Sequence, residues 1–556
     1  MNKEQSYAER PAQRPNVILL MADQLRADAL GYAGNPIVQT PNLDRLAGSG
    51  VVFERMFVQT PVCMASRASI FTGRYPRSIR VPSMGVLPPA ETTLAEELRR
   101  AGYVTGLFGK LHFTPMGYTI RSLGTDYELN DATPFLGPAG IDSAASRAAA
   151  ADPMKRNYGF DVGKGAGDMT WGHYLDWLQQ TAPEHVQDHV AENWGLGRAG
   201  VTYGDSPPAT RHFQPTVTDF FESHMPAEVH PSSWMVQEAL AFARANPDRP
   251  WFAHVSFVDP HHPFNAAVPY NRLYRPQDMP VPEEIDRDAC LPPGLPEGVL
   301  SYIRRFAQPG PEFWQWARAN YYGMVSHLDW CVGRLLDGLE QMGHLDDTLI
   351  VFTADHGEYA GDHRLLYKGS LHFDGLMRVP FVVTWARQLK GGRCVQAMVQ
   401  QIDIYPTVLA LLGLPIHAGV QGQDLSSVLH GGPEIGYERV TCELDLLPDP
   451  QYVPSQTIRS REWKLSYFPV ARTGMLFNLL DDPSERRNLY AESGCARVRE
   501  ELLIVRPAEQ HRLALRPRAR GTAPGPAAAP LRDEGPAAPP PQPGLTETST
   551  AAGRMA

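Results

Sequence analysis

Short apolar runs alternate along the chain with segments that carry apolar residues at helical spacing. The run NVILLMA (16–22) is apolar throughout, which is typical of a strand buried on both faces. Strand-like runs recur at 103–113, 251–258, 348–354 and 378–386. Strands that alternate with helices predict an α/β fold, a doubly wound and mostly parallel sheet.

Several of the intervening segments carry the residues that begin and end helices. In TPNLDRLAGSG, Thr40 is expected to cap a helix that Gly48 ends. In TTLAEELRRAG, Thr93 and Glu96 match a capping box. A longer helix is predicted over 321–343.

The character of the chain changes in three places, which suggests its domain organisation. Residues 14–435 are assigned to the α/β domain, with an irregular insertion at about 138–245 that is rich in Gly, His and Trp. Short alternating runs and a closing helix predict a small α+β subdomain over 436–505. The Pro/Ala-rich segment 506–556 cannot bury a core and is predicted to be a disordered tail.

Composition excludes several classes of protein. The 556 residues are 43% hydrophobic and carry a net charge of −10, so the chain has no basic footprint for nucleic acid. Six scattered cysteines without a CxxC pair argue against a zinc ribbon or a disulfide framework. The polar N-terminus lacks a signal-peptide core, and no apolar run reaches the roughly 20 residues of a membrane span. A soluble, cytoplasmic protein without membrane partners is expected.

Charged and polar side chains follow four of the predicted strands. Ligands of open α/β sheets bind at the carboxyl ends of the strands, so these side chains are expected to meet at one edge. Each alone is explained by a cap, a turn or packing, but together they indicate a site. The residues concerned are Asp23 and Gln24, Lys110 and His112, Asp259, His261 and His262, and Asp355 and His356.

The chemistry of these residues favours a cation and an anion bound side by side. Two aspartates and a histidine suit a divalent cation that is bound mainly through oxygen. With Arg67, Lys110 and Lys368 nearby, the positive charge would be in excess, so a sulfate, phosphate or phosphonate group is expected there.

Cys63 lies in PVCMASRASIFTGRYP, at the predicted start of a helix that Gly73 ends. Backbone N–H groups at a helix N-terminus favour anions, and Arg67 follows one turn later. Such surroundings lower the pKa of a thiol or hold an oxyanion, whereas an inert core cysteine would need neither.

Seven ordered blocks between residues 14 and 492 resemble the sulfatase family, within the alkaline-phosphatase-like superfamily. They are NVILLMADQLRADALG, TPNLDRLAGSGVVF, CMASRASIFTGRYP, GYVTGLFGKLH, DPHHPF, FTADHGEYAGDH with Lys368 following, and FNLLDDPSERRNL. The resemblance implies that a maturation enzyme oxidises Cys63 to formylglycine (3-oxoalanine), whose hydrate attacks sulfur. His261 and Lys368 would then bind sulfate and protonate the leaving alcohol, and His112 would be the base that expels sulfate.

The resemblance also implies the remaining roles. Lys110 and Arg67 match residues that hold the charge of the diol and the sulfate. The implied metal ligands are Asp23, Gln24, Cys63, Asp355 and His356. Calcium is the favoured cation, with manganese and magnesium as alternatives.

Three positions depart from the commonest pattern of the family. Ala65 stands where the usual modification motif has proline, although alanine is accepted in some members. Gln24 replaces an aspartate and, with His356, resembles the metal set of choline sulfatases and phosphonate monoester hydrolases. Near Met84, those relatives tend to have a polar asparagine that this chain lacks.

These residues lead to three hypotheses about function. The first is hydrolysis of a small-molecule sulfate monoester to alcohol and sulfate. The second is hydrolysis of a phosphonate monoester or phosphodiester at the same site, but such enzymes tend to carry Tyr and Thr where this chain has Lys110 and His112. The third is a non-catalytic oxyanion-binding protein, which would require the loss of a core residue that is present here. A homo-oligomer stays open.

Overall fold

The computed structural model describes residues 14–83, 85–113, 156–165, 173–192, 222–283, 287–306, 309–445 and 452–503. The chain divides into two compact units, residues 1–517 and 518–556, and every described residue belongs to the first. The predicted tail at 506–556, Met84 and much of the predicted insertion lie outside the described residues.

A nine-stranded sheet forms the centre of this unit, in the order β4-β3-β5-β1-β6-β8-β2-β7, with β9 also paired to β2. The four strands β3, β5, β1 and β6 are parallel neighbours, which confirms the predicted doubly wound sheet. All seven residues of β1 are buried, because strands and helices cover it on every side. The strands are β1 (Asn16–Ala22), β2 (Val51–Phe57), β3 (Val104–Gly109), β4 (Val162–Gly165), β5 (Trp251–Ser256), β6 (Thr348–Ala354), β7 (Arg378–Val379), β8 (Phe381–Thr384) and β9 (Arg393–Gln400).

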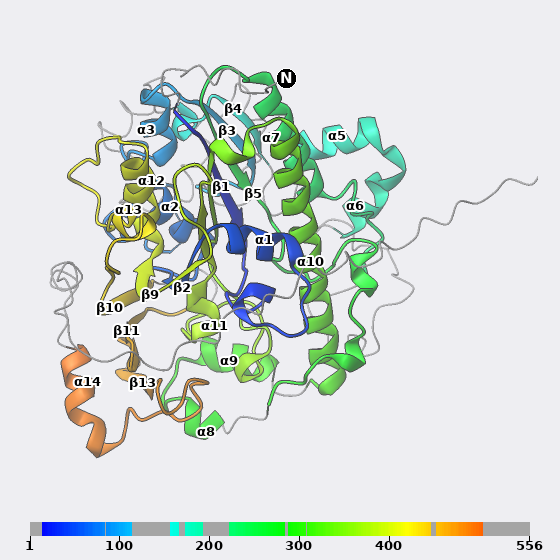
Figure 1. The fold of residues 1–556 in the computed structure, drawn as a ribbon. Helices are drawn as coiled ribbons and strands as arrows, with labels where there is room; N and C mark the ends of the chain where they lie inside the picture. Colours follow the sequence, from blue (N-terminus) through cyan, green and yellow to red (C-terminus); the bar gives the residue numbers. More distant parts are fainter. Residues whose placement is uncertain are drawn as a thin grey trace, which may run out of the picture. The chain divides into compact units, whose positions relative to one another are not determined.

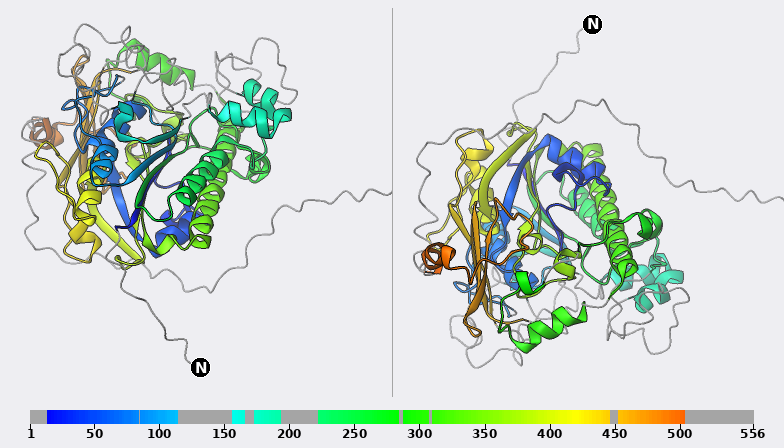
Figure 2. Two further views of the ribbon diagram at one scale, coloured as in Figure 1. Left: turned by 90° about the horizontal axis from the view of Figure 1, so that it is seen from above. Right: turned by 90° about the horizontal axis from the view of Figure 1, so that it is seen from below.

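Helices cover both faces of the sheet (Figures 1 and 2). Helices α1, α7 and α10 lie on one face, and α2, α3 and α12 lie on the other. The helices are α1 (Pro41–Ser49), α2 (Cys63–Thr72), α3 (Leu94–Arg100), α5 (His173–Thr181), α6 (Val186–Glu192), α7 (Pro231–Ala245), α8 (Arg287–Cys290), α9 (Glu297–Arg305), α10 (Pro311–Gln341), α11 (Asp374–Met377), α12 (Ile404–Leu411), α13 (Ser426–Leu429) and α14 (Ala496–Leu503). Among the described helices, none has both the length and the hydrophobicity of a membrane span.

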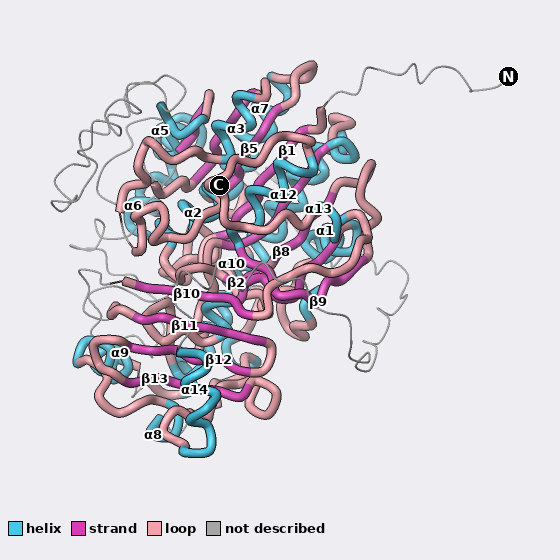
Figure 3. The backbone as a smooth tube through the Cα atoms, turned by 90° about the vertical axis from the view of Figure 1, so that its left-hand side faces the viewer, coloured by secondary structure: helices cyan, strands magenta, loops and turns pink. Residues whose placement is uncertain are grey.

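A second, antiparallel sheet follows in the C-terminal part of the same compact unit (Figure 3). Its strands pair in chain order, and the side chains of α14 pack against its apolar residues. The strands are β10 (Arg439–Leu444), β11 (Ser455–Ser460), β12 (Trp463–Phe468) and β13 (Thr473–Asn478). The predicted boundary near residue 436 therefore marks the beginning of the second sheet, which belongs to the same compact unit as the first.

Helix α1 begins where it is predicted to begin, with Thr40 as the N-cap residue, but it ends later. It continues through Gly48 to Ser49, and Gly50 follows as the C-cap. The side chain of Thr40 makes no capping hydrogen bond, and its Oγ1 accepts from the backbone N–H of Gly31 at 2.8 Å. The predicted capping box of Thr93 and Glu96 at the start of α3 is confirmed.

The segment predicted to be an irregular insertion contributes to the sheet scaffold in two places. Residues 231–245 form α7, which contacts β3, β5 and α10, and residues 162–165 form β4 at the edge of the sheet. Helix α7 begins after His230, whose imidazole accepts from the N–H of Ser232, and buries Trp234. The glycines of β4 hide its strand character from the hydrophobic pattern.

Gly109, the last residue of β3, is a position where we expect a methyl group to be costly. Its φ is +105°, and an added Cβ would lie 2.0 Å from the carbonyl oxygen of Ser256, which also accepts the N–H of Lys110 at 3.0 Å. Gly109→Ala is expected to lower the free energy of unfolding by about 2 kcal/mol or more. Gly102→Ala is the matched control, since Gly102 has φ +93° but open space around it. Equal losses for the two variants in denaturant titrations would contradict the steric part of this prediction.

Candidate active site

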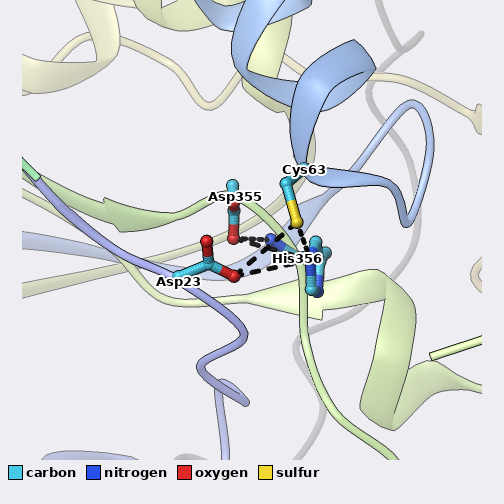
Figure 4. Close-up of side chains that lie close together, drawn as sticks. All are labelled: Asp23, Cys63, Asp355 and His356. Atoms are coloured by element: carbon cyan, nitrogen blue, oxygen red, sulfur yellow. Dashed lines mark hydrogen bonds and ion pairs between the residues drawn. The ribbon is translucent and has the colours of Figure 1, made fainter. Parts of the chain in front are cut away.

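Four buried side chains from three separate elements meet at the carboxyl edge of the sheet (Figure 4). Asp23 follows β1, Asp355 and His356 follow β6, and Cys63 is the first residue of α2. One ligand atom from each of the four lies within 4.8 Å of the others. The strand ends that the sequence pointed to are therefore brought together around Cys63.

The thiol of Cys63 lies at the N-terminus of α2 as predicted, and its neighbours are mainly cationic. Its Sγ accepts from Lys368 Nζ at 2.8 Å and lies 3.1 Å from Nε2 of His356. Burial alone would raise the pKa of this thiol, but Lys110, Lys368 and His356 outweigh burial and lower the pKa well below its ordinary value. Cys63 thus occupies a position that stabilises negative charge.

Arg67 contacts four protein groups around the cluster. Its guanidinium is fully buried, with Nε donating to Asp355 Oδ2 at 2.8 Å and Nη2 lying 3.2 Å from Asp23 Oδ2. Nη1 donates to the carbonyl of Lys110 and to Ser256 Oγ, each at 2.7 Å. Arg67 therefore holds the two aspartates in place, and these contacts use four of its five N–H donors.

Lys110 and Lys368 each contact a side chain of the cluster. Lys110 Nζ donates to Asp23 Oδ2 at 2.5 Å, while Lys368 Nζ lies 3.3 Å from Nε2 of His261. Nδ1 of His261 must carry a proton, because its neighbour at 2.7 Å is the carbonyl oxygen of His262. Nε2 of His261 is thereby turned toward Nζ of Lys368.

His112 follows β3 in a left-handed backbone conformation with φ +57°. Within the part of the chain that the structure describes, both of its buried ring nitrogens lack a hydrogen-bond partner. His112 is nevertheless close enough to the thiol to contribute to the lowered pKa of Cys63. An imidazole without a protein partner beside the central side chain is available for proton transfer.

The residues present fit a divalent cation. Nδ1 of His356 donates to the carbonyl of Gly357 at 2.8 Å, which directs the lone pair of Nε2 toward Cys63 and the aspartates. Gln24 adjoins them through its N–H, which donates to Asp355 Oδ1 at 3.0 Å, and its buried Oε1 has no partner among the described residues. Oxygen donors with one nitrogen suit a hard or borderline cation. Lys368 Nζ also lies 3.0 Å from Nε2 of His356. A bound cation would therefore compete with this ammonium for the lone pair of Nε2.

Two neighbours of His261 do not join the cluster in the way the sequence suggested. Nδ1 of His262 accepts from the Nε2 group of Gln24 at 3.1 Å, so His262 orients that amide. The carboxylate of Asp259 is directed toward Ser232 and His327, away from Cys63.

Glu358 was missed by sequence reasoning, although it supports the site. Its Oε2 accepts from Nε2 of Gln24, and its Oε1 accepts from the N–H of Ala360. This contact fixes the donor end of the Gln24 amide and leaves the acceptor end unpartnered. The only signal in the sequence was its place three residues after Asp355 in TADHGE.

Comparisons with known proteins agree with this geometry. The model of the Sulfatase family matches residues 15–414, and that of the N-sulphoglucosamine sulphohydrolase C-terminal region matches residues 355–506. The chain is 27% identical over 500 residues to an arylsulfatase of Clostridium perfringens, covering 86% of this chain and 90% of the relative. It is 28% identical over 521 residues to the multifunctional alkaline phosphatase superfamily protein PehA of Trinickia caryophylli, covering 87% and 92%.

A solved structure adds the fold-level comparison. The phosphonate monoester hydrolase of Agrobacterium radiobacter superposes with a TM-score of 0.67 at 28% identity, covering 90% of this chain and 96% of that chain. The likeness thus extends over the α/β unit and the small C-terminal sheet together.

Proposed function

Because the chain belongs to the sulfatase family and is a sulfuric ester hydrolase, we propose that it cleaves a sulfate monoester with a formylglycine made from Cys63, beside one bound divalent cation. The observation that carries this proposal is the position of Cys63, at a helix N-terminus between the carboxylates of Asp23 and Asp355 and the ammonium of Lys368. A maturation enzyme would be required as a partner, and Ala65 would lie in its recognition motif.

The cation would be held by Asp23, Asp355, His356 and the unpartnered Oε1 of Gln24, and calcium suits such an oxygen-rich set. Once bound, it would neutralise sulfate oxygens and make sulfur more electrophilic. Formylglycine, as its hydrate, supplies one hydroxyl that can attack sulfur and a second hydroxyl whose deprotonation releases sulfate.

Lys368 and His261 are proposed to bind the sulfate group and to protonate the leaving alcohol. Their nitrogen atoms, Nζ and Nε2, lie 3.3 Å apart, and Nζ of Lys368 donates to Cys63 Sγ at 2.8 Å. Protonation matters because an alkoxide is a poor leaving group. The hydrogen bond from Nδ1 of His261 to the carbonyl of His262 keeps the ring in the orientation that this role needs.

His112 is proposed as the base that takes the proton from the second hydroxyl, because its ring nitrogens are unpartnered within the described residues. Arg67 is proposed to orient Asp23 and Asp355, and Arg67 and Lys110 together are proposed to keep Asp23 ionised. Burial would raise the pKa of Asp23, but Lys110, His261 and Arg67 lower it well below its ordinary value.

Phosphonate monoester or phosphodiester hydrolysis is the second candidate function. It is favoured by the likeness to phosphonate monoester hydrolases from Agrobacterium radiobacter and Silicibacter pomeroyi. Against it stands the pair Lys110 and His112. The lysine is salt-bridged to Asp23, and the imidazole of His112 has no hydrogen-bond partner among the described residues.

Matched aryl esters distinguish the two functions. With a 4-nitrophenyl leaving group on both substrates, we expect the mature protein to show a higher kcat/KM for the sulfate than for the phenylphosphonate, because the site provides the sulfatase pair of lysine and histidine. A preparation of Cys63→Ala measures background hydrolysis by contaminants. A phosphonate kcat/KM equal to or above the sulfate value would replace the first function by the second.

A further inference from the structure

A second group of potential metal ligands lies behind the loop that carries His261. It consists of His230 at the start of α7, Asp259 after β5 and His327 in the middle of α10. One ligand atom from each lies within 4.8 Å of the others. The side chains of Asp259 and His327 are 7% and 1% exposed, and that of His230 is 12% exposed, so the group is shielded from bulk solvent.

The spacing of the three atoms matches a tetrahedral metal site. Asp259 Oδ2 lies 3.3 Å from Nδ1 of His327 and 3.6 Å from Nδ1 of His230. Metal–ligand bonds of about 2.0–2.1 Å place neighbouring ligands of a tetrahedron about 3.3 Å apart. A hydrogen bond from an N–H to oxygen is usually shorter, about 2.7–3.2 Å. The imidazole rings of His230 and His327 are nearly perpendicular, at 87°, so both can point at one atom without stacking.

Groups around these side chains orient them as outer-shell partners orient metal ligands. Ser232 Oγ donates to Asp259 Oδ2 at 2.8 Å, and Nε2 of His327 lies 3.6 Å from Cys331 Sγ. A histidine that binds metal through one nitrogen commonly gives the N–H of the other to such an acceptor. The N–H of Ser232 donates weakly to Nδ1 of His230 at 3.3 Å, a contact that a cation would replace.

A small cavity opens beside the group and provides room for a further ligand. Its volume is about 70 Å³, and His230 and Asp259 line it together with His189, Glu192 and Asn265. A cavity of this size has room for a water molecule between its polar side chains, and a water can complete the coordination of an ion. The same cavity is lined by His261 and His262, so the group borders the active site.

We propose that His230, Asp259 and His327 bind a second divalent cation, of the zinc type. The donor set differs from that of the catalytic cluster, because two imidazoles and one carboxylate make a softer site than two carboxylates and one imidazole. This inference goes beyond the proposed function and depends neither on formylglycine nor on turnover.

The cation would tie two helices, α7 and α10, to the loop that carries His261. Asp259 is two residues before His261, and its carbonyl oxygen accepts from the N–H of Asp23 at 3.3 Å. The N–H of His261 donates to the carbonyl of Val258 at 2.9 Å. An ion that joins α7, α10 and Asp259 would therefore restrain the backbone next to Asp23 and His261.

The test uses a full-length chain from which the catalytic cluster has been removed by Asp355→Asn and His356→Gln. After chelation and dialysis, this chain is titrated with Zn²⁺ by calorimetry, and bound zinc is counted by elemental analysis. One equivalent is expected to bind. Adding His230→Gln and His327→Gln is expected to abolish it, while Ser232→Ala is expected to weaken zinc binding by about tenfold or more.

The exposed His430 is the matched control, since His430→Gln removes an imidazole far from the group in sequence and leaves zinc binding unchanged. Circular dichroism checks that each variant is folded, and the visible spectrum of the Co²⁺ form reports tetrahedral coordination independently of affinity. If the folded catalytic-cluster variant binds no zinc, or if zinc binding survives His230→Gln with His327→Gln, the group is a hydrogen-bonded network and the proposal is wrong.

Discussion

Cys63→Ala is expected to lower kcat for sulfate ester hydrolysis by about 10³-fold or more, because it removes the side chain from which the proposed nucleophile is made. Alanine leaves the surrounding cluster in place: Arg67 still bridges Asp23 and Asp355, and His356 keeps its bond to the carbonyl of Gly357. Divalent cation binding, measured by calorimetry, is therefore expected to persist while turnover is lost.

The matched control is Cys442→Ala, which removes another buried thiol, in β10. It is expected to cost about 1 kcal/mol of stability through lost packing, with kcat unchanged. Peptide mass spectrometry across Cys63 of the wild-type protein should find an aldehyde in place of the thiol, in a fraction that equals the active fraction. Full turnover by Cys63→Ala, or by protein that carries only the unmodified thiol, would remove formylglycine from the mechanism.

The parts of the fold that could be predicted are those whose sequence pattern is local. β1 is buried along its whole length and reads as an unbroken apolar run, and α2 begins at Cys63 and ends at the left-handed Gly73. β2 was missed because Glu54 and Arg55 interrupt its pattern in VVFERMF. Its partners β7, β8 and β9 lie more than 300 residues away, and no short-range signal reports that pairing.

The candidate site shows the same division between local and long-range information. The carboxyl ends of β1, β3, β5 and β6 could be aligned from the sequence, because parallel strands deliver these ends to one edge. The pairing of the buried lysine and arginine side chains with the individual aspartates could not be predicted. Helical spacing placed Arg67 one turn after Cys63, but only packing decides that its guanidinium faces Asp23 and Asp355.

Arg67→Met is the substitution with the largest expected effect on stability. The guanidinium and both carboxylates that it pairs with are 0% exposed. Methionine would leave Asp355 without its arginine partner. Asp23 would keep Lys110 as its remaining lysine or arginine partner. Removing one member of a buried ion pair typically costs about 3–5 kcal/mol. The metal-free variant is expected to unfold at a clearly lower temperature than the metal-free wild type. Arg45→Met, which breaks a surface pair with Asp337, is the control and should cost about 1 kcal/mol or less.

A divalent cation should recover part of this loss, because it supplies the positive charge that Arg67 no longer gives to the two carboxylates. Saturating Ca²⁺ is therefore expected to raise the thermal midpoint of Arg67→Met by more than it raises that of the wild type. Arg67→Lys keeps the charge but cannot reach Asp355, Asp23, the carbonyl of Lys110 and Ser256 Oγ at once, so its stability should lie between the two. An equal response of wild type and Arg67→Met to Ca²⁺ would mean that the cation does not bind between Asp23 and Asp355. Arg67 would then be a purely structural residue, and the proposed metal site would have to lie elsewhere.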